Sequence, residues 1–138
     1  MLNGKRRAYH RNMGAAGGFT LIELLVVLAI VALMLSIAAP RYLNSIESSK
    51  ETLLIENLRI TREVIDRFYA DTGRYPNTLD ELVERNYLRA LPLDPVLDSD
   101  TAWQVLPVPY AIQAGGNVWD IRSGAPGSTR DGRPFSSL

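Results

Sequence analysis

The chain has 138 residues, with 15 lysines and arginines against 15 aspartates and glutamates and a formal net charge of zero. It contains no cysteine, which excludes disulfides and thiolate metal sites, and its one histidine, His10, leaves little scope for histidine-based catalysis or zinc binding. Residues 1–18 carry four cations and no acid, so the other 120 residues have 11 cations against 15 acids. Because the part expected to fold is acidic and has no basic stripe, the charges argue against a nucleic-acid-binding protein.

An apolar segment follows the basic start. Leu24–Ala39 is a run of 16 residues without a charge. As a helix, Phe19–Ala39 would be about 31 Å long, close to the thickness of the hydrocarbon core of a bilayer. Such a segment argues against a soluble cytosolic enzyme. Three interpretations fit residues 1–40: a cleaved secretory signal, a plain membrane anchor, or a leader followed by an assembly helix that the protein retains.

Glu23, near the start of the apolar segment, distinguishes these interpretations. Ser36-Ile37-Ala38 before Ala39 offers a signal-peptidase site, but an acid at position 23 adds nothing to such cleavage. A plain anchor keeps the basic side cytoplasmic, yet it leaves a carboxylate whose burial costs about 2.5–3.5 kcal/mol on insertion scales. Under the third interpretation, a cut after Gly18 creates an amine one helical turn from Glu23. Pairing between Glu23 and the amine of a neighbouring chain would then relieve the burial cost of both groups.

The residues around this acid carry a resemblance. Gly17-Gly18-Phe19-Thr20-Leu21-Ile22-Glu23-Leu24-Leu25 resembles the cleavage and methylation site of the type IV pilin-like family. The resemblance implies that a membrane prepilin peptidase cuts after Gly18 and that the new N-terminus, Phe19, is N-methylated. It further implies that Glu23 serves filament assembly and that Pro40 bends the helix.

The domain organisation follows from this interpretation. We expect residues 1–18 to be a basic leader that is removed and residues 19–40 to be a transmembrane and assembly helix. Residues 41–138 are expected to form a periplasmic amphipathic helix and a globular head.

The pattern beyond Pro40 predicts that the helix continues. Gly73 suits a left-handed helix cap and Pro76 cannot continue a helix, so we expect the helix to end near Asp71. One helix over residues 19–71 and two helices hinged at Pro40 both remain open, since proline kinks a helix without always ending it. The apolar residues that would face the head recur at alternating four- and three-residue spacing: Leu54, Leu58, Thr61, Ile65 and Phe68.

The remaining residues predict a short helix and a small sheet. Thr78-Leu79-Asp80-Glu81 matches a capping box, so a short helix should begin there, and two prolines make residues 87–95 an irregular connection. We expect a hairpin turn at Gly115-Gly116-Asn117 and a loop from Ser123 onward. The expected strands are Thr101–Val105, Tyr110–Gln113 and Val118–Arg122, and the aromatic residues expected in the core are Tyr69, Tyr75, Tyr87, Trp103, Tyr110 and Trp119.

Several head segments resemble one branch of the family, the major pseudopilins of type II secretion systems. The resemblance implies an α+β fold in which a long N-terminal helix packs on a small antiparallel β-sheet head. The segments that carry it are Tyr69-Ala70-Asp71-Thr72-Gly73-Arg74-Tyr75-Pro76, Leu79-Asp80-Glu81-Leu82, Tyr87-Leu88, Leu93-Asp94-Pro95 and Trp119-Asp120-Ile121-Arg122-Ser123-Gly124.

No catalytic motif is present in the sequence, so we expect no enzyme and no cofactor. Carboxylate pairs such as Asp98 and Asp100 have no histidine or phosphate loop beside them and are interpreted as solvated surface charge. The family resemblance implies Ca²⁺ in the C-terminal loop, where Asp120 and Asp131 would be the candidate ligands. Calcium takes six to eight oxygen ligands, and two acids beside arginines predict weak binding or none. We expect hydrogen bonds from Arg122 or Arg130 and packing of Phe135 to hold the loop instead.

The resulting functional hypothesis is a structural one. The resemblance implies a pseudopilus subunit that assembles from the inner membrane, with its head in the periplasm, and supports export of folded proteins across the outer membrane. Its partners would be other pseudopilins in a homopolymer, the prepilin peptidase and N-methyltransferase, the inner-membrane secretion platform and membrane lipid, with no nucleic acid. Two alternatives stay open: a type IV pilin serving adhesion, motility or DNA uptake, and a membrane-anchored periplasmic binding domain that forms no polymer.

Overall fold

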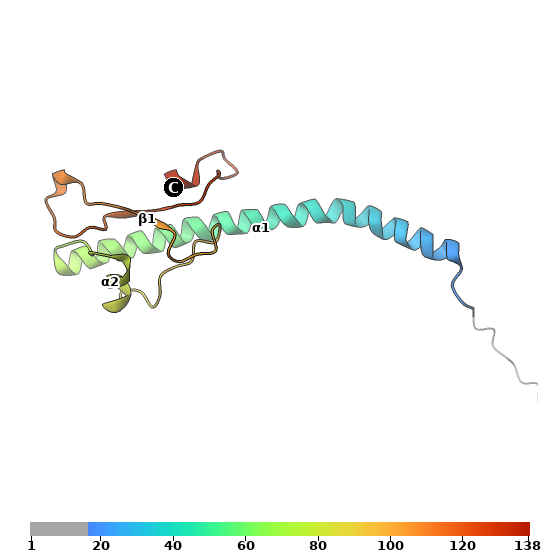
Figure 1. Ribbon diagram of the computed structural model, residues 1–138, viewed down its shortest axis with the longest axis horizontal. Helices are drawn as coiled ribbons and strands as arrows, with labels where there is room; N and C mark the ends of the chain where they lie inside the picture. The colour runs from blue at the N-terminus through green and yellow to red at the C-terminus, as the bar shows by residue number, and fades with distance from the viewer. Residues whose placement is uncertain (1–16) are drawn as a thin grey trace, which may run out of the picture. The chain divides into compact units, whose positions relative to one another are not determined.

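The computed structural model describes residues 17–138 (Figure 1). The chain divides into two units, Met1–Pro40 and Arg41–Leu138, the first of which is described from Gly17. The architecture is α+β, as predicted. The elements in chain order are α1 (Leu21–Thr72), α2 (Leu79–Glu84), β1 (Trp103–Leu106), the 3₁₀ helix η1 (Tyr110–Ile112), β2 (Asp120–Ser123) and the 3₁₀ helix η2 (Phe135–Ser137).

Helix α1 is one continuous element of 52 residues that contains Pro40, which confirms the single-helix alternative. Thr20 begins it, because its hydroxyl accepts a hydrogen bond from the Glu23 N–H at 3.2 Å and its carbonyl accepts one from the Leu24 N–H at 3.2 Å. Gly73 ends it at φ +73°, with its N–H donating to the Tyr69 carbonyl at 2.8 Å. A left-handed glycine after the last helical turn is the end that the sequence predicted.

The second half of α1 supplies the main wall of the core in the unit Arg41–Leu138. The predicted stripe of five residues is buried, together with Val64. A helix buries one face in this way when apolar side chains recur every three to four residues. Leu82 from α2 and Ile121 from β2, both fully buried, complete this core with Trp103 and Val118.

Helix α2 begins at the predicted capping box, but the Glu81 side chain binds the N–H of Asn77 and not that of the N-cap residue Thr78. The Thr78 hydroxyl accepts a hydrogen bond from the Glu81 N–H at 3.3 Å, as expected for an N-cap. The Glu81 carboxylate accepts from the Asn77 N–H at 2.7 Å and also binds the Arg74 guanidinium. These two donors lower the pKa of Glu81 to about 2, since both stabilise the charged carboxylate. Helix α2 is therefore tied to the end of α1 by an ion pair that reaches across the turn.

The sheet has two antiparallel strands, β1 and β2, in the register Trp103↔Ser123 to Leu106↔Asp120. The predicted strand at Tyr110–Gln113 is wrong, because this segment contains η1 and the Tyr110 side chain is 95% exposed. Pro107 and Pro109 precede it, and a residue without an N–H cannot donate to a strand ladder. The sheet therefore pairs the first and third predicted strands.

The hairpin predicted at Gly115-Gly116-Asn117 is also wrong, because this segment docks on the turn after α1. The Tyr75 N–H donates to the Gly115 carbonyl at 2.8 Å, and the N–H groups of Asn117 and Val118 both donate to the Pro76 carbonyl at 3.0 Å. Gly116 has φ +102°, and a Cβ there would lie 2.1 Å from the Tyr75 carbonyl oxygen. Glycine is required here by close backbone approach and not by a hairpin turn.

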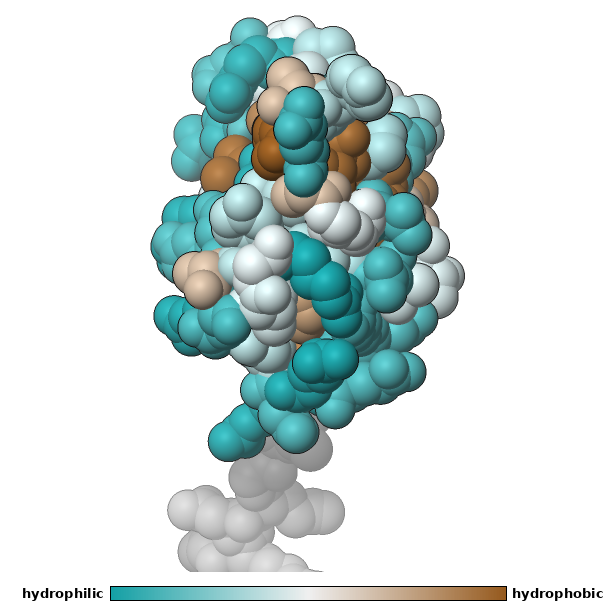
Figure 2. All heavy atoms as spheres, turned by 90° about the vertical axis from the view of Figure 1, so that its left-hand side faces the viewer, coloured by the Kyte–Doolittle hydropathy of each residue, from teal (hydrophilic) through white to brown (hydrophobic). Residues whose placement is uncertain are grey.

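The aromatic residues divide between core and surface. Tyr75 and Trp103 are buried, and Tyr87 packs on Phe68 with 5.1 Å between the ring centroids. Tyr69, Trp119 and Tyr110 are exposed, so the prediction that all six aromatic residues fill the core is wrong for these three. Figure 2, which faces one end of the head, shows a mainly hydrophilic face with small hydrophobic groups between polar side chains.

Candidate functional site

The predicted cleavage site lies just before α1. Gly18 and Phe19 are exposed, and Phe19 has 82% of its surface accessible. Among residues 17–138, a Cβ added to Gly18 would meet no atom within 4 Å, so no contact with this part of the chain requires glycine there. Because Thr20 caps α1, a cut after Gly18 would leave the start of the helix intact.

Glu23 lies in the first turn of α1, where a negative charge is favoured by the helix dipole. Its backbone N–H is used in the Thr20 cap. Within residues 17–138 its carboxylate takes part in none of the hydrogen bonds or ion pairs. The carboxylate of Glu23 therefore has no partner in the described part of its own chain.

The first half of α1 exposes its apolar side chains. It is long and apolar enough to cross a membrane, and none of the residues in its most apolar stretch is buried within the chain. Leu24, Leu28 and Leu35 each keep more than half of their surface accessible. So much exposed apolar surface marks a segment that contacts lipid or another protein chain.

Pro40 lies inside α1. Proline has no N–H to donate to the carbonyl four residues earlier, and its ring crowds that carbonyl, which here belongs to Ser36. The Ser36 hydroxyl donates to the Ala32 carbonyl at 2.9 Å, one turn further back. The bend that we predict at Pro40 stays a prediction.

Asp120, the first candidate calcium ligand, is held by an arginine. Its Oδ1 accepts hydrogen bonds from Arg62 Nε at 2.6 Å and from the Ile121 N–H at 2.8 Å. Arg62 Nη2 also donates to the Ile121 carbonyl at 2.9 Å and to the Leu138 carbonyl at 2.7 Å. One guanidinium therefore joins α1, β2 and the C-terminal segment.

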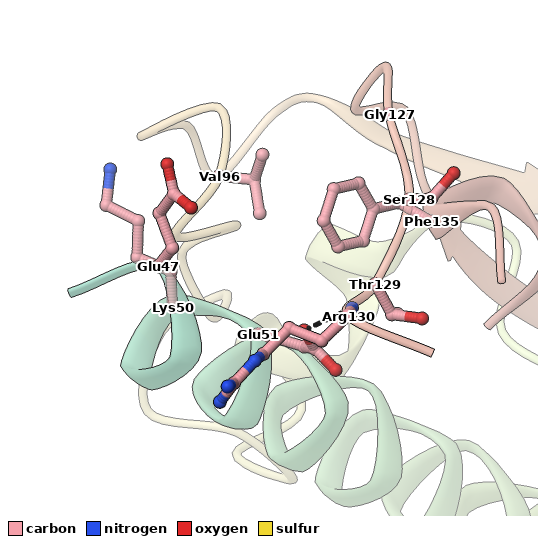
Figure 3. A pocket seen from close by; sticks show the side chains of 9 residues that line it. All are labelled: Glu47, Lys50, Glu51, Val96, Gly127, Ser128, Thr129, Arg130 and Phe135. Carbon is pink, nitrogen blue, oxygen red and sulfur yellow. Dashed lines mark hydrogen bonds between the residues drawn. The ribbon is translucent and has the colours of Figure 1, made fainter. Parts of the chain in front are cut away.

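Asp131, the second candidate, is an exposed residue of the loop between β2 and η2. This loop lies against α1 around a cavity of about 470 Å³ (Figure 3). The Arg130 N–H donates to Glu51 Oε2 at 3.0 Å, and Arg130 Nη1 donates to Ser48 Oγ at 3.1 Å. Phe135 lines the cavity and packs on the core, so the prediction that Arg130 and Phe135 hold the loop is confirmed.

Comparison with known proteins identifies the N-terminal segment first. Residues 13–39 match the family model described as the prokaryotic N-terminal methylation motif, and they contain Gly18, Phe19 and Glu23. No solved structure matches the chain.

One relative that is matched over nearly its whole length extends this similarity to the head. The chain is 26% identical over 137 residues to the type II secretion system core protein G of Xanthomonas campestris pv. campestris, covering 96% of this chain and 92% of the relative. It is 30% identical over 94 residues to the core protein G of Klebsiella pneumoniae, covering 56% of this chain and 67% of the relative. The chain belongs to the type II secretion system core protein G family. The core protein G of Aeromonas hydrophila is similar as well, at 28% identity over 94 residues.

The residues of this core protein G family member do not fit the calcium site that the resemblance implied. Asp120 is engaged by Arg62, and Arg130 lies in the loop that would surround the ion. Over residues 17–138, no three side chains of His, Cys, Asp or Glu lie close enough to share a metal ion. Calcium takes six to eight oxygens, usually with several carboxylates, and the two candidate carboxylates here are Asp120 and Asp131.

Sequence analysis missed two polar residues that organise the head. Asp94 is fully buried; its Oδ1 accepts from the Val96 and Leu97 N–H groups at 2.9 and 3.2 Å, and its Oδ2 accepts from the Ser123 hydroxyl at 2.5 Å. The dipeptide Asp94-Pro95 is a turn signal that could have revealed this role. Arg62 gave no comparable signal, because its three acceptors lie about 60 to 76 residues away in sequence.

Proposed function

We propose that the chain is a structural subunit of a type II secretion pseudopilus and not an enzyme. The observation that carries this proposal is an exposed apolar helix that overlaps a methylation motif and contains an acid without a partner among residues 17–138. The names of its relatives support the secretion system, since each is a core protein G.

In this proposal, prepilin peptidase removes residues 1–18 and Phe19 becomes the N-methylated N-terminus. Residues 1–16 lie outside the described part of the chain, so the leader rests on the motif alone. Residues 19–40 hold the subunit in the inner membrane and later pack in the filament. Residues 41–138 form the periplasmic head, and the C-terminal loop is held without calcium by Arg130 and Phe135.

Glu23 would set the register of assembly. A lone carboxylate among apolar side chains is costly in a membrane, and the terminal amine of Phe19 on a neighbouring subunit is a cation of matching chemistry. The contact joins two different surfaces of identical subunits, so it propagates along a helix and does not close into a ring. Apolar contacts between α1 helices would supply most of the assembly free energy.

The partners in this proposal are other pseudopilins, the prepilin peptidase and N-methyltransferase, the inner-membrane secretion platform and lipid. A type IV pilin would share the first half of α1 and the methylation motif. The match over 96% of the chain to a core protein G favours the pseudopilin. A membrane-anchored binding domain would have no use for Glu23.

Electron microscopy tests the proposal directly. When the chain is overproduced with a type II secretion platform and prepilin peptidase, we expect filaments to be sheared from the cells without detergent. Peptide mass spectrometry of these filaments should find N-methylated Phe19 at the start of the chain. A processed chain that stays monomeric in the membrane would overturn the polymer, and a chain that begins at Ala39 would overturn the assembly helix.

A further inference from the structure

A second cavity lies where the unit Arg41–Leu138 begins. Its volume is about 380 Å³, and every residue that lines it is polar. Five of these residues come from one face of α1 at spacings of one, three and four residues, and one comes from the C-terminal loop. The residues are Arg41, Asn44, Ser45, Ser48, Ser49 and Arg130.

The charged side chains that line this cavity are both positive. Two arginines line it and no acid does. Within the part of the chain that the structure describes, neither arginine forms an ion pair. Glu51, which lines the neighbouring cavity with Glu47, accepts from the backbone N–H of Arg130, while the Arg130 guanidinium donates to the Ser48 hydroxyl. Two guanidinium groups in one polar cavity match the acceptor oxygens of a phosphate.

The position of the cavity along α1 indicates where the phosphate comes from. The apolar run ends at Ala39, and Arg41 lies two residues later. Ser45 lies one helical turn beyond Arg41. If residues 19–39 span the hydrocarbon core, Arg41 lies about 3 Å beyond the core along the helix axis, within the headgroup layer, which is about 5–7 Å thick on each side of the membrane. Ser45 lies about 9 Å beyond the core, just outside this layer. Arginine side chains at this level are in reach of lipid phosphates.

We propose that these residues, the Arg41–Arg130 site, bind the phosphate of an anionic lipid headgroup while the subunit is in the membrane. The proposal rests on the proposed function, because it takes residues 19–39 to span the bilayer. The Arg130 side chain makes the C-terminal loop part of the site, so lipid binding and docking of this loop on α1 are coupled.

Native mass spectrometry of the full chain, solubilised in detergent and titrated with phosphatidylglycerol, tests the site. We expect a one-to-one lipid adduct, and we expect Arg41→Gln and Arg130→Gln each to weaken it by about fivefold, the effect of one cation at a lipid surface. The matched control is Lys50→Gln. Lys50 is a cation of α1 that lines the other cavity and does not line this one. This variant should leave the adduct unchanged.

Three results would overturn the site. Equal adducts in Arg41→Gln and Lys50→Gln would show that binding is not localised; Arg41 is the decisive position because it is exposed and its loss leaves the loop contacts in place. Displacement of the lipid by millimolar inorganic phosphate would assign the site to free phosphate. Incorporation of the chain into phosphatidylcholine nanodiscs is measured in parallel. Normal incorporation without a lipid adduct would contradict the lipid site alone. Failed incorporation would contradict the membrane helix and with it the proposed function.

Discussion

The two halves of α1 share one backbone but have opposite surroundings. Residues 21–40 expose apolar side chains, and Leu28 for example is 57% accessible. Residues 41–72 expose mainly polar side chains and bury a stripe in which Leu54, Ile65 and Phe68 are fully inaccessible. The same secondary structure therefore serves contacts outside the chain in its first half and contacts inside the chain in its second half.

The carboxylates that the account depends on differ in the same way between the first half of α1 and the head. Glu81 and Asp120 meet arginines of their own chain, whereas the Glu23 carboxylate meets none among the described residues. Substitutions in the first half should change processing and assembly and leave the head folded, while substitutions in the second half should change stability.

The largest effect is expected at the cleavage site. Gly18→Val should leave the uncut chain in the membrane, because a branched side chain next to the cut bond obstructs the peptidase. It should not alter the fold, since the space around Gly18 is open. Immunoblots and intact mass measure the cut, with Gly17→Val as the control that places the same side chain one residue away. Full cleavage of the Gly18→Val chain would show that the peptidase cuts at a different bond.

In the second half, Phe68→Ala should destabilise the head by about 3–5 kcal/mol, the usual cost of truncating a buried phenylalanine. Phe68 is fully buried, packs on Tyr87 and has the guanidinium groups of Arg74 and Arg85 at 5.2 and 5.9 Å from its ring centroid. Thermal melting of the detergent-solubilised chain measures the loss. Leu28→Ala is the matched truncation in the first half, and an equal loss of stability there would contradict the division of α1.

Acid should weaken the head through Glu81. Its folded pKa of about 2 lies below the ordinary value, because Arg74 and the Asn77 N–H donate to the carboxylate. The resulting stability is present above the unfolded pKa of about 4.3 and is lost as the pH falls from there toward 2. Glu81→Gln should remove about 1–3 kcal/mol at neutral pH, as expected for hydrogen bonds to a charged group, and should flatten melting temperature against pH between about 5 and 2. If the Glu81→Gln chain kept the wild-type dependence of melting temperature on pH, groups other than Glu81 would cause the acid sensitivity.

The smallest expected effect is that of calcium, which should not change the melting temperature of the chain. A ligand at a hundred times its dissociation constant would stabilise the chain by about 2.7 kcal/mol, enough to shift the melting temperature of a small domain by several degrees. We expect identical melting curves with millimolar calcium and with chelator. A calcium-dependent rise that Asp131→Asn abolishes would show that the loop binds the ion after all.

The sequence predicted the elements that depend on local patterns. Periodic apolar residues, the Gly73 cap and the Thr78 capping box are each decided by residues within one or two turns, and each is present. The strand at Tyr110 and the hairpin at Gly116 failed, because distant partners decide them: Gly116 packs on the Tyr75 carbonyl, some 40 residues earlier.

The candidate site divides in the same way. Gly18, Phe19 and Glu23 are found from a contiguous motif, and their chemistry needs only the order of residues along the chain. The roles of Arg62 and Asp94 depend on side chains that folding brings together from positions 29 or more residues away, such as Ser123 and Asp120. The Asp94-Pro95 dipeptide indicates a local turn, but no pattern near Asp94 or Arg62 indicates these distant partners.

The most direct test of the divided helix is Glu23→Leu, measured for both filament yield and head stability. The matched control is Glu47→Leu, which makes the same substitution at an exposed acid in the second half of α1. The account predicts that the chain with Glu23→Leu is cleaved after Gly18 and melts at the wild-type temperature but yields no filaments, while Glu47→Leu still yields them. Wild-type filament yield with Glu23→Leu, or a head that melts at lower temperature, would contradict the assignment of Glu23 to contacts between subunits.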